Sequence, residues 1–212
     1  MNQPTKVGLL VPILAILPVM ACTSSGSKPT FQPIPTPTTP PGFVKYSDEL
    51  SSFSIEYPRE WQLVTSQMTF IEGQVKDFVE GKGDYSLDSV ASVFFAGDAD
   101  RRYTVGINVE SLQSNMTLDE FAEGAAAFAE ELFPSFQVHR ISKVQVGGKP
   151  AVLVEATFEA SDFDPSLSGS VQQTLLTFLL GKAAWTVACG YPGDPGSAQT
   201  CESVVRTIRI LE

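Results

Sequence analysis

Alternating apolar and polar positions predict a mainly antiparallel sheet over most of the chain after Phe43. In Phe53-Ser54-Ile55-Glu56-Tyr57 the three large apolar side chains fall on one face, and Pro58 ends the strand. Similar patterns predict a short run from Trp61 and strands over 92–96, 103–112, 136–146, 151–158, 172–180, 183–189 and 208–211. Most of these segments follow one another without the helical crossover that parallel pairing requires. We expect tight hairpin turns at Gly147-Gly148 and Gly181-Lys182.

Three further segments have helical spacing. Thr117 and Glu120 form a capping box ahead of a helix whose apolar face contains Phe121, Ala125, Phe128, Ala129 and Leu132. A second helix is predicted over 73–80, and a third begins at Asp194-Pro195, with an N-cap followed by proline at the first helical position. We expect helices on both faces of the antiparallel sheet. The fold class is therefore predicted to be α+β, with an α/β/α sandwich for 43–212.

The N-terminal segment has the pattern of a secretory signal peptide. Lys6 supplies the charge, residues 7–19 are apolar, and Ala21 precedes Cys22. The apolar run is shorter than the ~20 residues of a spanning helix. We predict a signal peptide over 1–21, although an uncleaved membrane anchor and a signal cut elsewhere remain alternatives. The pattern at Cys22 resembles the lipobox of bacterial lipoproteins, which implies that the Cys22 thiol carries a diacylglyceryl group.

Residues 22–42 are rich in serine and glycine and then in proline, which predicts an extended tether without a core. Its prolines would also suit a partner that recognises proline-rich segments. The chain has three cysteines, and exported proteins normally pair their thiols. If Cys22 carries lipid, Cys189 and Cys201 form the natural disulfide. Two buried free thiols or a redox pair are the alternatives.

The net charge and the motifs of the chain argue against several classes of partner and active site. All 24 acidic residues follow Phe43, and the domain has a formal charge of −12, which disfavours nucleic-acid partners. His139 is the only histidine, so a multi-histidine metal site is excluded, and a surface or hydrogen-bonded role is expected. No nucleotide-binding or hydrolase motif occurs, and we expect no cofactor and no catalytic residue. Carboxylate pairs in expected loops, Asp98 with Asp100 and Asp162 with Asp164, are interpreted as turn formers, with Ca²⁺ binding as the alternative.

Three short motifs resemble the PsbP-like superfamily. Tyr46 followed by residues 53–61 resembles its opening hairpin and aromatic strand, 146–151 its central glycine hairpin, and 203–208 its closing helix and strand. The resemblance implies the α/β/α sandwich also found in Mog-type Ran-binding proteins, and a binding or assembly role. It carries over no ligand residue. Tyr57 and Trp61 are expected to pack in the core, with an exposed recognition patch as the alternative.

The sequence thus predicts a binding or assembly module, lipid-anchored to a bacterial membrane with its domain outside the cytoplasm. We expect it to recognise its partner through a groove between sheet and helix. Its protein or small-molecule partner is not identified. A secreted enzyme with an unrecognised active site and a structural envelope protein are the alternatives.

Overall fold

The fold is α+β, as predicted. The computed structural model describes residues 40–48, 52–64, 79, 90–100, 102–112, 116–193 and 195–211. The strands are β1 (Phe43–Asp48), β2 (Phe53–Pro58), β3 (Gln62–Leu63), β4 (Val90–Gly97), β5 (Thr104–Ser111), β6 (Gln137–Val146), β7 (Lys149–Glu159), β8 (Ser170–Leu180), β9 (Ala183–Pro192) and β10 (Arg209–Ile210). The helices are α2 (Leu118–Leu132), α3 (Ala160–Phe163) and α4 (Pro195–Val205).

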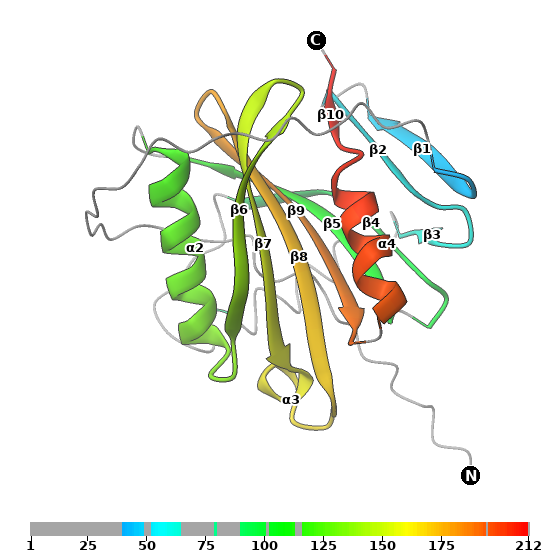
Figure 1. The fold of residues 1–212 in the computed structure, drawn as a ribbon, viewed down its shortest axis with the longest axis vertical. Coiled ribbons are helices and arrows are strands. Elements are labelled where there is room, and N and C mark those ends of the chain that lie inside the picture. Colours follow the sequence, from blue (N-terminus) through cyan, green and yellow to red (C-terminus); the bar gives the residue numbers. More distant parts are fainter. Residues whose placement is uncertain are drawn as a thin grey trace.

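Two antiparallel sheets organise these strands (Figure 1). The large sheet has the order β3-β4-β5-β9-β8-β7-β6, and the small one has the order β1-β2-β10. We expected a single sheet, and this part of the prediction is wrong. Both chain ends of the domain contribute to the small sheet, because β10 pairs with β2 through Arg209 opposite Ser54 and Ile210 opposite Phe53. Such pairing of distant segments leaves no signal in either strand's own pattern.

The two predicted hairpin turns are confirmed. Gly147 and Gly148 connect β6 to β7 with φ angles of 55° and 78°, and Gly181 begins the β8–β9 turn with a φ of 61°. Positive φ values of this kind are the normal conformation of a tight hairpin and favour glycine. Between β7 and β8 the chain forms α3 instead of the expected loop. Asp162 therefore lies in a short helix, which corrects our placement of it.

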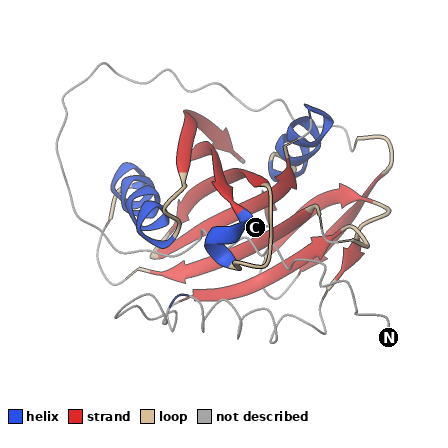
Figure 2. Ribbon diagram, turned by 90° about the horizontal axis from the view of Figure 1, so that it is seen from below, coloured by secondary structure: helices blue, strands red, loops and turns tan. Residues whose placement is uncertain are grey.

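The two faces of the large sheet contribute to two separate hydrophobic clusters. On one face Trp185 and Val187 of β9 pack with Ile55 of the small sheet and with Val204 and Ile208 at the end of the chain. The other face buries a second cluster, whose main members are Phe95, Phe128, Leu132, Phe158 and Ala188. Helix α4 and the small sheet thus cover one face, and α2 lies on the other. Figures 1 and 2 show the two helices well separated.

The capping box of α2 is confirmed. The Glu120 backbone N–H donates to Thr117 Oγ1 at 3.2 Å, and the Thr117 N–H donates to Glu120 Oε2 at 2.7 Å. These two bonds satisfy donors that a helix start otherwise leaves without partners. Phe121, Phe128 and Leu132 are buried, as the predicted apolar face requires.

Several predictions concern residues that the structure does not describe. The signal peptide over 1–21, Cys22, almost all of the tether and most of the helix expected over 73–80 lie outside the described residues. Within that last segment Val79 is described, as a helical and fully buried residue. Among the described helices, none combines the length and apolar character needed to cross a membrane.

Candidate functional site

Helix α4 is fastened to the large sheet by the predicted disulfide. Cys189 of β9 and Cys201 of α4 are bonded, with their Cα atoms 5.5 Å apart, and both are fully buried. Because the two residues come from elements adjacent in the chain, the bond closes a short loop around the start of α4. The disulfide holds the helix across β8 and β9.

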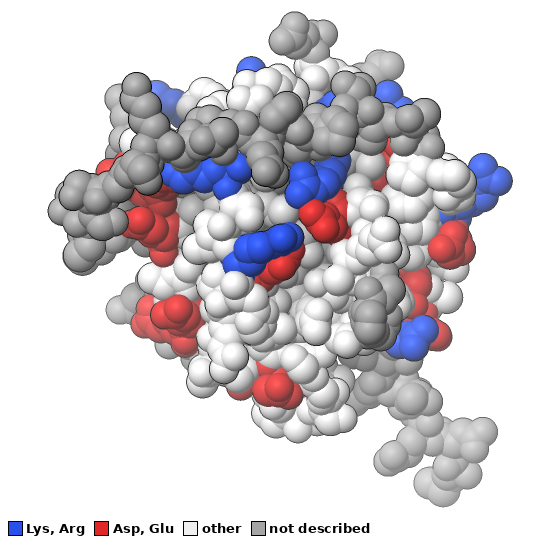
Figure 3. Space-filling model, in the orientation of Figure 1, with Lys and Arg blue, Asp and Glu red and all other residues white. Residues whose placement is uncertain are grey.

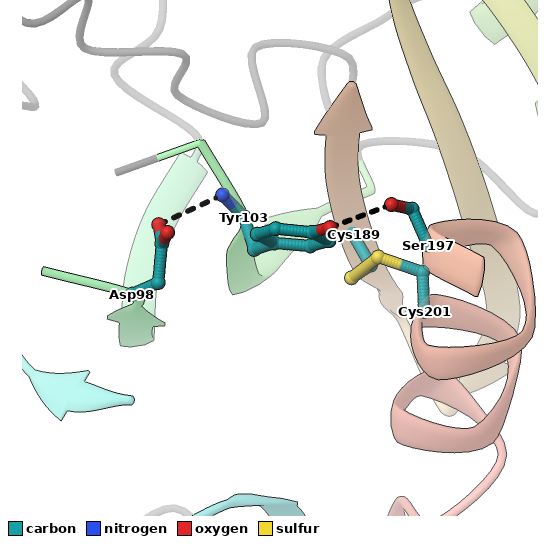
Figure 4. Close-up of a disulfide and its surroundings, with 5 residues drawn as sticks. All are labelled: Asp98, Tyr103, Cys189, Ser197 and Cys201. Atoms are coloured by element: carbon teal, nitrogen blue, oxygen red, sulfur yellow. Dashed lines mark hydrogen bonds between the residues drawn. A yellow bond between two sulfur atoms is a disulfide. The ribbon is translucent and has the colours of Figure 1, made fainter. Parts of the chain in front are cut away.

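A second connection joins α4 to the turn between β4 and β5, next to β9 in the large sheet (Figure 4). The Tyr103 hydroxyl shares a hydrogen bond of 2.7 Å with Ser197 Oγ, and the Tyr103 N–H donates to Asp98 Oδ1 at 2.9 Å. The Trp61 ring lies 6.1 Å from the Tyr103 ring. Asp98 therefore acts in the turn between β4 and β5, as predicted. Helix α4 is held at Ser197 in its first turn and at Cys201 one turn later.

On the sheet face that α4 covers, the side chains of β7 and β8 change from apolar to polar halfway along each strand. On β7 the same face carries Ala151 and Leu153 and then Glu155 and Thr157, while on β8 it carries Phe178 and Leu176 and then Thr174 and Gln172. The apolar halves pack in the core below the small sheet. The polar halves line a cavity of about 340 Å³ beside α4, which we call the α4 groove. Its lining residues are His139, Glu155, Ala156, Thr157, Gln172, Thr174, Tyr191, Ala198, Gln199 and Glu202.

Strand register explains why these side chains converge. Thr157 lies opposite Gln172 across the β7–β8 pair, and Gln172 lies opposite Tyr191 across the β8–β9 pair. Cross-strand neighbours on one face have Cβ atoms ~5 Å apart, so the three residues form a continuous polar row. A parallel row begins with Glu155 opposite Thr174. Helix α4 closes the groove with Ala198, Gln199 and Glu202.

A β-bulge brings His139 into the groove. The register between β6 and β7 shifts between Val138 and Arg140, which leaves His139 as an extra residue. Bulges of this kind re-aim a side chain. His139 Nε2 shares a hydrogen bond of 2.8 Å with Thr157 Oγ1. The expectation of an exposed, hydrogen-bonded histidine is confirmed, but its place in a groove was not predicted.

The two charged residues of the groove wall, Glu155 and Glu202, are both acidic. Each is paired with an arginine that is not itself among the lining residues. Arg140 Nη2 forms an ion pair with Glu155 and lies 4.0 Å from Glu202 Oε1. Arg206 Nη2 lies 2.7 Å from the same oxygen of Glu202. On the surface shown in Figure 3, basic and acidic side chains alternate over this part of the molecule.

Tyr191 lies at the floor of the groove and is almost fully buried. Burial raises the pKa of its phenol, and the nearby carboxylates of Glu155 and Glu202 raise it further, whereas a hydrogen bond with Thr174 has the opposite effect. The phenol is therefore neutral at ordinary pH. It adds a hydrogen-bonding group to the groove without adding charge.

The other predicted candidates have structural roles. Tyr57 and Trp61 are buried, so their expected packing role is confirmed. Asp162 Oδ2 accepts from the Ser135 N–H at 2.9 Å, and Asp164 Oδ1 accepts from the Ser166 N–H at 2.8 Å. In the described part of the chain, no three His, Cys, Asp or Glu residues gather as a metal site would require.

A groove between sheet and helix was expected from the sequence, but the residues that line it were not identified. The signal was present in β7 and β8, where one face of each strand changes from apolar to polar halfway along. Taken alone, such a change is also the pattern of a strand whose end reaches solvent. Only the position of α4 distinguishes the two cases.

Comparison with solved structures supports the fold. The chain resembles cyanobacterial PsbP (CyanoP) from Synechocystis sp. PCC 6803 with a TM-score of 0.54 and 12% identity, over 80% of this chain and 92% of that chain. Two weaker likenesses are the Saccharomyces cerevisiae Ran-binding protein Mog1p (TM-score 0.47, 11% identity, 80% and 96% covered) and LpqN, involved in cell envelope biogenesis of Mycobacterium tuberculosis (0.46, 12%, 76% and 83%). No protein-family model and no curated protein sequence matches. At these identities the likeness concerns the fold alone, and this chain has a PsbP-like fold.

Proposed function

We propose that this protein is a lipid-anchored, extracytoplasmic binding or assembly module that binds its partner in the α4 groove. The groove carries the proposal, because it gathers convergent polar side chains in a concave space of about 340 Å³. Concave sites with a few placed polar groups are where proteins most often bind ligands. The groove is also held in shape by the disulfide and by the Tyr103–Ser197 hydrogen bond, which lowers the cost of ordering it on binding.

The anchor is proposed from Cys22 and the residues around it. An apolar run too short to span a membrane precedes Cys22, and a proline-rich segment follows. A buried disulfide in the domain suits an oxidising compartment outside the cytoplasm. The tether would then hold the groove away from the membrane surface, within reach of envelope components.

Site-specific photocrosslinking in intact cells tests the binding role. A crosslinking amino acid replaces Gln199, an exposed residue of the groove, and in a matched variant it replaces Glu131, an exposed residue of α2 on the other face. We expect a discrete crosslinked product from position 199 and none from position 131. The same product from both positions, or none from either, would contradict the proposal and favour a structural envelope protein.

We assign no catalytic role to the domain. A secreted enzyme is the competing function, and it predicts that a ligand captured at position 199 is chemically altered by the protein. Mass spectrometry of the captured ligand, before and after incubation with the purified full-length protein in detergent, measures this difference. A changed mass would overturn the non-catalytic assignment.

A further inference from the structure

We propose that the α4 groove binds a positively charged side chain, arginine or lysine, of a protein partner, and that Arg140 occupies the same position in the absence of that partner. This inference rests on the proposed binding function and specifies the class of partner. It follows from the charges of the groove wall and from the position of Arg140.

The groove wall has a formal charge of −2 when His139 is neutral. Its charged residues are Glu155 and Glu202, and no lysine or arginine is among the lining residues. The remaining polar groups, from threonine, glutamine and tyrosine, provide oxygen acceptors for N–H donors. The domain as a whole is acidic, which attracts basic partners over longer distances. Arg140 and Arg206 balance these carboxylates from outside the lining, so displacing Arg140 leaves Glu155 for an incoming cation.

Arg140 shows where a cation fits. Its guanidinium is paired with Glu155 of β7 and lies 4.0 Å from Glu202 of α4, so it bridges the two sides of the groove. The Arg140 side chain is 52% exposed, and its two partners are 31% and 36% exposed. Ion pairs this accessible contribute little to stability, so an incoming guanidinium or ammonium group can replace Arg140 at small cost. Planar guanidinium groups suit carboxylate pairs best.

Two other residues adapt the groove to such an exchange. Arg206 also holds Glu202, with its Nη2 2.7 Å from Glu202 Oε1, so this carboxylate keeps its position when Arg140 leaves. Tyr191 adds a neutral hydroxyl at the floor. The bulge at His139 places Arg140 at the rim, on the edge strand β6, where it can turn toward solvent.

Binding of a charged peptide and its neutral analogue tests the inference. The probe is an end-blocked, fluorescently labelled peptide with three arginines separated by glycines. Its analogue carries citrulline, which has nearly the same shape without the charge. Fluorescence anisotropy with the purified full-length protein in detergent, at one fixed ionic strength, measures both affinities. We expect the citrulline peptide to bind at least about tenfold more weakly, since it forms no charge-assisted hydrogen bonds.

Charge-matched variants separate groove binding from general attraction to an acidic protein. We expect Arg140→Ala to tighten arginine-peptide binding about two- to fivefold, since it removes a competing cation. Lys143→Ala is the control, because Lys143 lies on the same strand but pairs with Asp119 instead. Glu155→Gln and Glu202→Gln should each weaken binding about two- to fivefold, whereas Asp119→Asn should not. Arg140→Gln provides a second variant that retains more of the side chain.

Two results would overturn the inference: equal binding of both peptides, or identical effects of Arg140→Ala and Lys143→Ala. A partner crosslinked at position 199 together with either of these results would leave the binding function standing and remove only the charge preference. Absence of both crosslinking and peptide binding would remove both.

Discussion

At the scale of single residues, Trp61 shows how much one buried ring contributes. Its side chain is only 6% exposed and packs beside Tyr103. We expect Trp61→Ala to lower the free energy of unfolding by about 3–5 kcal/mol, as large-to-small aromatic changes in cores do. Leu63→Ala is the control, since Leu63 is 38% exposed on the same short segment and should cost far less. Urea denaturation measures both. An unchanged midpoint for Trp61→Ala would show that the ring does not belong to the core.

Buried and partly buried tyrosines make the stability of the fold sensitive to alkaline pH. Burial raises the pKa of Tyr46, Tyr57 and Tyr191 above the ordinary value of 10.0. The unfolded chain therefore ionises first as the pH rises. The contribution of these tyrosines to the free energy of unfolding is fully present below about pH 10. It is lost as the pH rises through the raised pKa values.

We expect Tyr191→Phe to reduce this alkaline loss. The observable is the difference between the urea midpoints at about pH 8 and about pH 11, measured for each protein separately. Any constant cost of removing the hydroxyl cancels in that difference. Equal differences for the variant and the unmodified protein would argue against a raised pKa at Tyr191.

At the scale of elements, the attachment of α4 decides whether a groove exists. The Cys189–Cys201 bond joins residues 12 positions apart in the chain, and closing a loop of that size stabilises the folded state by about 3 kcal/mol in the chain-entropy model. We expect the double variant Cys189→Ala/Cys201→Ala to lose about that amount and still retain the sheet. Denaturation curves and far-UV circular dichroism measure the two quantities. Thiol titration of the denatured, unreduced Cys22→Ser protein provides the direct control, and two free thiols would disprove the bond.

The Tyr103–Ser197 hydrogen bond should stabilise the fold most when the disulfide also holds α4 against the sheet. Tyr103→Phe removes it with little change in shape, at an expected cost of about 1 kcal/mol. In the disulfide-free background we expect a smaller cost, because the two contacts hold the same helix. A double-mutant cycle measures the coupling. Strictly additive costs would mean that the two contacts act independently.

At the scale of the whole molecule, Cys22 is the residue on which the proposed location depends. We expect Cys22→Ser to release the protein from the membrane fraction or to leave its signal peptide uncleaved, since stable anchoring requires the acyl chains. Mass spectrometry of the mature N-terminus identifies the modification. The disulfide double variant serves as the control, because it should remain membrane-bound. An unmodified Cys22 in a membrane-bound protein would refute the anchor.

Local features of the fold could be predicted from the sequence by itself. The capping box at Thr117 and the hairpin at Gly147-Gly148 each depend on residues close in the chain, which is why they were found. The burial of Trp61 was expected from its large aromatic ring, although its contact with Tyr103 joins distant segments. The pairing of Cys189 with Cys201 was predicted by elimination, and the structure contains it. The opening aromatic motif indicated the PsbP-like fold.

Tertiary structure alone decided the rest. The separation of β1, β2 and β10 into a second sheet depends on pairing between the two ends of the domain. The α4 groove depends on a bulge in β6, a change of polarity within β7 and β8, and a helix that crosses them. Polar residues such as Glu155 and Gln172 have the same pattern in a sequence whether they meet water or a neighbouring element. Which of the two they meet is determined by contacts between segments far apart in the chain, and those contacts have no local signature.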